Sequence, residues 1–484
     1  MKFGGTSVGG AEQMVQVAEI VARCREGNLH YASPVGGLET ASRPQDVVVT
    51  VSAMSGVTDI LISAAQSAGR RDGDVFRLAA TELRQRHRAV LEALVTTAGR
   101  RAALLWEIDA LVSDFENLCQ AIFVLGELTA RGLDAVASFG ERLSARLVAT
   151  ALQERGVPAQ AVEATNLIVT DDNYGAASPL MEQTCRRTRD MLLPLLAEGV
   201  TPVVTGFIGA TVEGTTTTLG RGGSDYSAAL LGSCLESPEI WIWTDVDGVQ
   251  TADPRVVSDA RTLPEISYGE AAELSYFGAK VLHPKTILPA VEKSIPLRIL
   301  NTFNPDHPGT LVVAEEHPCA HAVKGVTSIK GLSLVTVEGR GMLGVPGMAA
   351  KLFAAVAGEG ISVLMISQSS SEQSICLVIR QDAEELALAA LQAAFELELA
   401  RRNVDRISAQ EDVAIIAVVG AGLKETPGVG AKVFGALGIA GINVISIAQG
   451  SSKYNLSLVV SAGDADDAVR AMHEHLELGM EHDG

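Results

Sequence analysis

Two glycine-rich segments carry residue types that bind phosphate. Lys2-Phe3-Gly4-Gly5 places two glycines directly after a short expected strand and before a helix-forming run. Backbone N–H groups at such glycines can approach a phosphate closely, and a neighbouring lysine can neutralise phosphoryl oxygens. The second segment, Gly220 to Asp225, combines three glycines with Arg221, whose guanidinium can form paired hydrogen bonds with a carboxylate. Each segment alone could also be an ordinary turn, so the prediction rests on their combination.

Acidic and hydroxyl side chains follow further expected strands. The segment Thr244 to Asp247 ends a tryptophan-containing strand, where carboxylates could contact ribose, adenine or metal-bound phosphate, or form an Asx-rich turn. Ser52 to Thr58 follows another strand, and Glu141 enters an expected helix. The segment Phe277 to Pro284 contributes Lys280, whereas its His283 has no neighbouring cysteine or histidine and is expected to be structural. Together these residues could handle an anionic substrate.

The elements that must position these side chains alternate between strands and helices over roughly the first 310 residues. Apolar, β-branched runs at 47–51, 202–207 and 240–244 are typical of buried parallel strands, and each is followed by Gly, Ser or Asp. Such a pattern places ligand-binding loops at the carboxyl edge of the sheet. Residues 59–131 have helical spacing and predict an all-helical elaboration, and 27–45 predicts an inserted surface loop.

The last third of the chain contains an internal repeat. Residues 346–378 match residues 427–459 at a constant offset of 81, with 15 of 33 positions identical. Each copy predicts a strand, a Pro-Gly turn, an amphipathic helix and two further strands, which together form one small α+β module. Two copies are too few for a solenoid, so a pair of packed sibling domains is expected.

Composition excludes several classes of protein. The chain has 484 residues and a net charge of −20, which argues against a nucleic-acid surface. No apolar stretch is long enough to cross a membrane, and the N-terminus shows no signal peptide. Six widely spaced cysteines without a CxxC motif predict reduced thiols and a cytoplasmic location. No P-loop motif occurs, and Val419 to Gly422 lacks the third glycine of a dinucleotide fingerprint.

Six segments in a fixed order resemble the aspartokinase family, and the repeats resemble its paired ACT domains. The segments are KFGGTSV, VSAMSGVT, SFGE, GRGGSDYSAALL, WTDVDGV with ADPR, and FGAKVLHP. The resemblance implies an α/β amino-acid-kinase three-layer sandwich with a mainly parallel sheet over residues 1–313. It also implies a linker at 314–328 and two α+β ACT domains of ferredoxin-like fold at 329–400 and 401–484.

The resemblance implies transfer of the γ-phosphoryl group of ATP to the β-carboxylate of L-aspartate, the first step toward lysine, threonine and methionine. Mg²⁺ would arrive with the nucleotide, without a metal site of the protein's own. Lys2 and Asp225 would be catalytic, and Gly4, Gly5, Thr244, Asp245, Arg255 and Lys280 would hold the nucleotide. Ser52, Thr58, Glu141, Arg221 and Ser224 would bind aspartate. Family members often have an aromatic residue at position 250, so Gln250 implies no stacking on the base.

The implied reaction needs no general base. An aspartate side chain with a pKa near ~3.9 is already ionised at neutral pH. The barrier comes from bringing an anion to a polyanion, so catalysis should rest on positioning, cations and Mg²⁺. We therefore expect Lys2, Arg221, Arg255 and Lys280 to form a basic pocket inside an acidic molecule.

The repeats resemble most the aspartokinase portion of fusions with homoserine dehydrogenase that respond to threonine. This implies an effector site at Gln368, Gln449, Met342 and Val363, with threonine favoured and lysine next, and a homodimer or homotetramer formed through the ACT domains. The chain ends without a dehydrogenase region, which predicts a monofunctional enzyme. The alternatives are a kinase for N-acetylglutamate or glutamate, and a non-catalytic amino-acid sensor.

Overall fold

The computed structural model describes residues 1–29, 31, 45–278, 282–314, 322–369, 373–423, 425–449 and 454–480. Most of the predicted 27–45 loop, and Lys280, therefore lie outside the described residues. The chain divides into two compact units. The first is Met1–Val249, Thr262–Tyr268 and Val281–Glu315, and the second is Gln250–Arg261, Gly269–Lys280 and Glu316–Gly484. The second unit thus includes two segments that the sequence places inside the predicted catalytic region.

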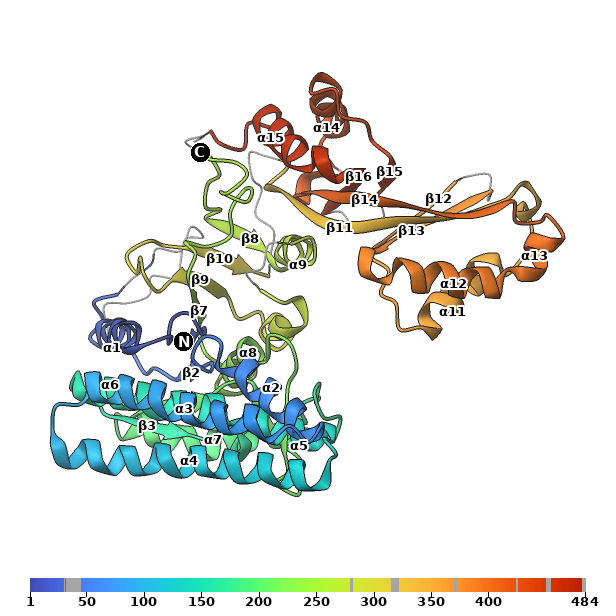
Figure 1. Ribbon diagram of the computed structural model, residues 1–484. Coiled ribbons are helices and arrows are strands. Elements are labelled where there is room, and N and C mark those ends of the chain that lie inside the picture. The colour runs from blue at the N-terminus through green and yellow to red at the C-terminus, as the bar shows by residue number, and fades with distance from the viewer. Residues whose placement is uncertain are drawn as a thin grey trace. The chain divides into compact units, whose positions relative to one another are not determined.

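The first unit is built on a mainly parallel sheet with the strand order β3-β4-β2-β1-β7-β9-β10-β8, in which only the β9–β10 pair is antiparallel among the described strands (Figure 1). Central strands such as β7 are continuous apolar runs because helices cover both faces. The strands are β1 (Lys2–Phe3), β2 (Val49–Val51), β3 (Ala159–Val162), β4 (Thr201–Thr205), β7 (Ile240–Thr244), β8 (Glu265–Ser267), β9 (Leu297–Asn301) and β10 (Thr310–Val313).

Helices cover the sheet on two sides, which makes three layers. One apolar core joins the sheet to the side of α1, α2, α3, α4 and α6, and a separate core joins it to α7 and α8. The helices are α1 (Ala11–Arg25), α2 (Val57–Gly69), α3 (Gly73–Leu94), α4 (Ala98–Leu125), α5 (Ala130–Ala137), α6 (Phe139–Glu154), α7 (Met181–Ala197), α8 (Gly223–Leu235) and α10 (Leu288–Glu292), with a small hairpin of β5 (Ile208–Ala210) and β6 (Thr216–Thr218). The predicted sandwich with a mainly parallel sheet is confirmed.

The expectation that all cysteines are reduced is wrong for one pair. Helices α7 and α8 pack against each other, so Cys185 and Cys234 meet in a disulfide with their Cα atoms 4.6 Å apart, although 49 residues separate them in sequence. Cys24 and Cys119 are free and buried. Cysteine spacing alone therefore does not indicate a reducing compartment for this chain.

The second unit has an antiparallel sheet with the order β12-β13-β11-β14-β16-β15. The repeat is visible as two sets of strands and helices of the same kind in the same order. Its strands are β11 (Gly325–Glu338), β12 (Met365–Gln368), β13 (Ser374–Arg380), β14 (Arg406–Val419), β15 (Ser446–Ala448) and β16 (Asn455–Ser461), and its helices are α11 (Met348–Gly358), α12 (Glu384–Ala394), α13 (Glu396–Ala400), α14 (Val429–Ile439) and α15 (Ala465–His475). Helix α9 (Tyr268–Tyr276) joins this unit from Gly269 onward.

The two repeats share strands. The first part of β11 pairs with the end of β14, and Val326 lies in the core of the second repeat. The later part of β11 pairs with the start of β14, and Val335 lies in the core of the first repeat. The strand β11 also begins at Gly325, within the range predicted as a linker. Each repeat therefore completes its sheet and core with residues on the far side of the predicted boundary.

None of the helices within the described ranges is long and apolar enough to cross a membrane.

Candidate active site

A cavity of about 710 Å³ opens in the first unit where β1, β2 and β7 end. Strands β2 and β7 flank β1 in the sheet, so their carboxyl ends meet beside Gly4. Eleven of the predicted site residues line this cavity: Lys2, Gly4, Gly5, Ser52, Thr58, Glu141, Arg221, Ser224, Asp225, Thr244 and Asp245. The parallel sheet brings together residues that are up to 243 positions apart in sequence.

The pair of Lys2 and Asp225 forms one wall of the cavity. The Lys2 Nζ atom lies 2.7 Å from Asp225 Oδ1, and both side chains are largely buried. Asp225 stands in the first turn of α8, so the positive end of that helix also stabilises its carboxylate. A Cβ atom on Gly4 would lie 3.6 Å from Lys2 Nζ, and one on Gly5 would lie 3.0 Å from the Ala53 carbonyl oxygen. The bare backbone at this point leaves room for a phosphate to approach Lys2.

Glu141 forms a second wall and is a buried carboxylate with an unused acceptor. Its Oε1 accepts a hydrogen bond from the Ala53 N–H at 3.1 Å, whereas Oε2 is buried and has no hydrogen-bond partner among the described residues. Burial raises the pKa of Glu141 to about 8, and the Ala53 N–H only partly offsets this shift. A cation placed beside Oε2 would remove the cost of ionising this carboxylate, so the position suits a substrate ammonium group.

Arg221 stands on a turn between β6 and α8 whose glycines have left-handed backbone conformations. Gly220 has φ +76° and Gly222 has φ +72°, and a Cβ on Gly220 would lie 3.1 Å from the Gly175 carbonyl. The turn therefore requires glycine at both positions. The Arg221 side chain is exposed, and its guanidinium makes no ion pair or hydrogen bond with any described residue. It is free to bind a carboxylate of a ligand in the cavity.

The cavity is less basic than expected. Its described lining contains five carboxylates, from Asp59, Asp134, Glu141, Asp225 and Asp245, and two cations, Lys2 and Arg221. The expectation of a basic pocket is therefore wrong for the described residues, because carboxylates, one of them paired with Lys2, outnumber the cations.

A divalent cation carried by a nucleotide suits this lining. Mg²⁺ usually keeps several waters and takes one or two carboxylates together with phosphate oxygens. Asp225 and Asp245 offer such carboxylates, and no cluster of three metal-ligating side chains occurs among the described residues. The residues present fit an ion that arrives with the nucleotide.

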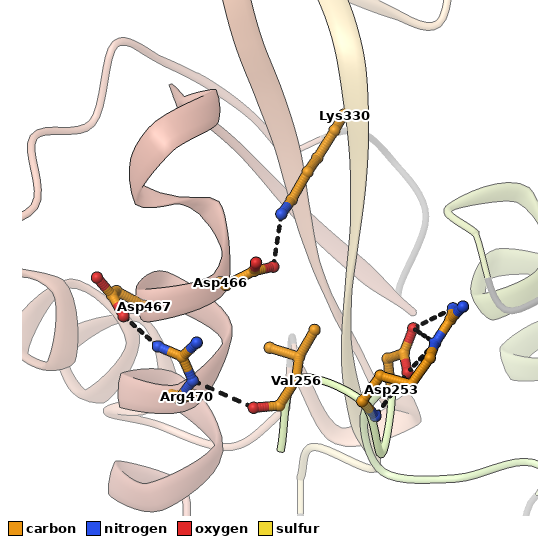
Figure 2. A network of polar contacts seen from close by, with 7 residues as sticks. Asp253, Val256, Lys330, Asp466, Asp467 and Arg470 are labelled. Carbon is orange, nitrogen blue, oxygen red and sulfur yellow. Dashed lines mark hydrogen bonds and ion pairs between the residues drawn. The ribbon is translucent and has the colours of Figure 1, made fainter.

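Arg255, which was predicted to contact the nucleotide, lies in different surroundings from the residues that line the cavity. It belongs to the second unit and is highly exposed, and its guanidinium donates three hydrogen bonds to the Asp253 carboxylate at 2.6 to 3.2 Å. Figure 2 shows its loop against α15, where Arg470 donates to the Val256 carbonyl at 3.1 Å. Arg255 does not line the cavity in the described structure. The family resemblance implied a nucleotide contact here, because ADPR belongs to the same motif as the end of β7.

The predicted effector residues lie in the second unit. Met342 and Gln368 line a cavity of about 300 Å³ in the first repeat, together with the Pro346 turn. Val363 instead packs against the core of that repeat. Gln449 is exposed just after β15, at the position equivalent to Gln368, and β12 and β15 approach each other where Ser367 Oγ donates to the Ile447 carbonyl at 3.1 Å.

One buried residue of the cavity was missed by sequence reasoning. Asp134 in α5 is only 2% exposed, and both of its carboxylate oxygens accept hydrogen bonds. Asp134 and Glu141 both line the cavity, from the consecutive helices α5 and α6. No local pattern marks Asp134, because its three donors lie 41 and 84 positions away in sequence.

Comparison with known proteins agrees with this architecture. Residues 1–301 match the amino acid kinase family, and residues 335–395 and 416–476 match the ACT domain. The chain is 39% identical over 99% of its length to a bifunctional aspartokinase/homoserine dehydrogenase 1 of Zea mays, of which it covers 50%. The chain thus spans about half the length of this curated relative.

Two Escherichia coli comparisons cover whole chains. The lysine-sensitive aspartokinase 3 is 34% identical, with 98% of both chains covered. The crystal structure of aspartokinase III in complex with aspartate and ADP superposes with a TM-score of 0.77 at 33% identity, over 98% of this chain and 99% of that chain. The sequence motifs, the three-layer sandwich and these matches agree, and the chain belongs to the amino acid kinase family and, within it, to the aspartokinases.

Proposed function

We propose that this chain transfers the γ-phosphoryl group of ATP to the β-carboxylate of L-aspartate, giving ADP and 4-phospho-L-aspartate. The observation that carries the proposal is a cavity that brings together three features: the Lys2–Asp225 pair, the Glu141 carboxylate with its unpaired Oε2, and the Arg221 guanidinium. Neither Oε2 nor the guanidinium has a hydrogen-bond partner among the described residues. These three features match a transferring phosphate, an ammonium and an α-carboxylate. The E. coli structure with aspartate and ADP bound supports the same substrates.

The reaction follows from these positions. Glu141 Oε2 accepts hydrogen bonds from the substrate ammonium, and Arg221 binds the α-carboxylate, which directs the β-carboxylate toward Lys2 and the glycines. This carboxylate attacks the γ-phosphorus, and the bond to the β–γ bridging oxygen of ATP breaks. Lys2 stabilises charge on the transferring group, while Asp225 holds the Lys2 side chain in place. The Ser52, Thr58 and Ser224 hydroxyls lie near the acceptor, and Thr244 and Asp245 lie at the nucleotide end.

The alternative acceptors suit the cavity less well. The nitrogen of N-acetylglutamate is acylated and carries no positive charge, so Glu141 would remain buried without a counter-ion. Glutamate keeps the ammonium but is one methylene longer, which moves its side-chain carboxylate away from the position set by Glu141 and Arg221. A non-catalytic sensor has no need for a buried Lys2–Asp225 pair.

Acyl phosphate formation tests the proposal. The purified protein with ATP and Mg²⁺ is expected to give a hydroxylamine-trapped product with L-aspartate, and at most a small fraction of that amount with L-glutamate or N-acetyl-L-glutamate. A product with N-acetylglutamate but not with aspartate would replace the proposal with the alternative kinase. The absence of product with all three would favour the sensor.

We further propose that threonine is the effector and that it binds at Gln368 and Gln449. The described lining of the 300 Å³ cavity in the first repeat contains an amide and apolar groups but no carboxylate to pair with the ε-ammonium of lysine. The Gln368 amide can donate to a carboxylate and accept from a hydroxyl. The E. coli relative is named lysine-sensitive, so lysine is the competing effector.

Effector identity can be read from initial rates. Threonine at millimolar concentration is expected to inhibit the wild type, and Gln368→Ala should raise the inhibitory concentration of threonine by about tenfold, the effect of losing one or two hydrogen bonds to a charged ligand. Gln373→Ala is the matched control, because it removes an amide directly before β13, the strand that pairs with β12. Inhibition by lysine alone would overturn the assignment.

An oligomer formed through the ACT repeats and a cytoplasmic location belong to the same proposal. Ile366 on β12 and Ile447 on β15 are 49% and 44% exposed, which is typical of positions that another subunit covers.

A further inference from the structure

We propose that Asp134 is a positioning residue that sets the distance between the Arg221 guanidinium and the Glu141 carboxylate, and so fixes the recognition of an α-amino acid. This inference rests on the proposed function, because it assigns the two ends of the substrate to those side chains. Asp134 itself need not contact substrate. It acts through the turn that carries Arg221.

The Asp134 carboxylate binds the two chain segments that support this turn, the end of β6 and the turn at Gly175. Its Oδ1 accepts a hydrogen bond from Thr218 Oγ1 at 2.8 Å. Its Oδ2 accepts two more, from the Thr218 N–H at 2.8 Å and from the Gly175 N–H at 2.9 Å. Thr218 is the last residue of β6, and its carbonyl accepts from the Ala177 N–H. The carboxylate therefore joins β6 to the Gly175 turn.

The turn that carries Arg221 rests on these two anchored segments. Gly220 lies two residues after Thr218, the anchored end of β6, and a Cβ on Gly220 would meet the Gly175 carbonyl at 3.1 Å. The turn closes when the Gly223 N–H donates to the Gly220 carbonyl, where α8 begins. If Asp134 no longer held Thr218 and Gly175, the two segments beside Gly220 could shift relative to each other, and Arg221 would move with them.

The same residue is tied to Glu141 through the helices. Asp134 lies in α5, and Glu141 lies in the first turn of α6, which begins only two residues after α5 ends. Glu141 is held in turn by the Ala53 N–H. One short helical connection and three hydrogen bonds thus link the ammonium-binding group to the turn of the carboxylate-binding group. Small displacements in such a constellation cost large factors in rate.

The chemistry of the anchor predicts how substitutions behave. Asn at position 134 can keep the geometry, because its carbonyl oxygen can accept the two N–H groups while its amide donates to the Thr218 hydroxyl. Ala leaves all three donors without their acceptor. We therefore expect Asp134→Ala to raise the KM for L-aspartate about 30-fold with the KM for ATP within about twofold, and Asp134→Asn to restore most of the affinity.

A double-mutant cycle on kcat/KM for L-aspartate tests the inference. If Asp134 acts through Arg221, Asp134→Ala should cost much less in the Arg221→Ala background than in the wild type, since the group it positions is already gone. Glu239→Gln is the matched control: this buried carboxylate pairs with Arg298 at 2.6 Å and stands before β7, at the opposite end of that strand from the cavity. It should leave both KM values unchanged.

The possible outcomes distinguish a failure of this inference from a failure of the proposed function. Equal costs of Asp134→Ala in both backgrounds, or a parallel rise in the KM for ATP, would show a merely structural role and overturn the inference. A wild type that makes no acyl phosphate from aspartate would overturn the proposed function instead. If Asp134→Ala does not fold, as judged by circular dichroism, Thr218→Val removes one of the three hydrogen bonds. It should raise the KM for aspartate about threefold in the wild-type background and leave kcat/KM unchanged in Arg221→Ala.

Discussion

Lys2→Ala is expected to reduce kcat by about 10³-fold while the KM for L-aspartate changes by less than about threefold. Lys2 is the cation beside the glycines at the phosphate end of the cavity, and removal of one preorganised electrostatic contact to a transition state typically costs about 10² to 10³ in kcat. The variant also leaves the Asp225 carboxylate buried without its partner at 2.7 Å, which repels the incoming phosphates and adds to the loss.

The measurement is steady-state hydroxamate formation over a grid of aspartate and ATP concentrations. Lys2→Arg keeps the charge but not the compact ammonium, so it should recover only part of the rate. Lys330→Ala is the control, because it removes a lysine–aspartate pair of the same 2.7 Å length in the second unit. A Lys2→Ala variant with more than a tenth of the wild-type kcat would show that the transferring phosphate does not depend on Lys2.

Glu141→Gln should reduce kcat/KM for L-aspartate by about 10² to 10³-fold, because losing a buried charged partner costs about 2–5 kcal/mol. The burial that raises the pKa of Glu141 to about 8 also predicts the pH profile of the wild type. Only the ionised carboxylate pairs with the substrate ammonium, so log kcat/KM should rise with a slope near one as pH increases toward about 8, and then level. Glu141→Gln should abolish this rise.

The profile is read from kcat/KM because that constant reports ionisation in the free enzyme. Glu384→Gln is the control, since Glu384 is also a buried carboxylate with an oxygen that lacks a hydrogen-bond partner within the described ranges, but lies in the second unit. A Glu141→Gln variant that keeps both the wild-type efficiency and the wild-type pH profile would show that the ammonium binds elsewhere.

Local patterns predicted the parallel sheet and the loops at its carboxyl edge, and the family resemblance implied most of the residues that line the cavity. An apolar strand followed by glycine or a hydroxyl residue places its loop at the carboxyl edge, so Gly4, Ser52 and Thr244 meet without any knowledge of long-range contacts. The gap-free repeat likewise indicated the two regulatory copies. Local patterns were sufficient to predict those parts of the fold that depend only on the order of strands, helices and loops along the chain.

The remaining features depend on tertiary contacts that no local pattern encodes. Arg255 follows β7 by only eleven residues, yet its segment packs with α15 of the second repeat, where Ala252 and Val257 join the apolar core. The Cys185–Cys234 disulfide depends on how α7 packs on α8. The role of Asp134 was not predicted, because its three hydrogen-bond donors belong to residues 41 and 84 positions away in sequence.

The membership of residues 250–261 in the second core has a consequence for protein engineering. Ala252 and Val257 are buried with Val433 and Val469 of the second repeat, so a cut near residue 315 would strip these residues of their apolar neighbours. The two repeats also cannot be separated cleanly from each other, because both of them use strands β11 and β14. The second unit therefore cannot be transplanted as residues 316 onward alone: a folded chimera must exchange residues 250–261 and 269–280 together with that segment.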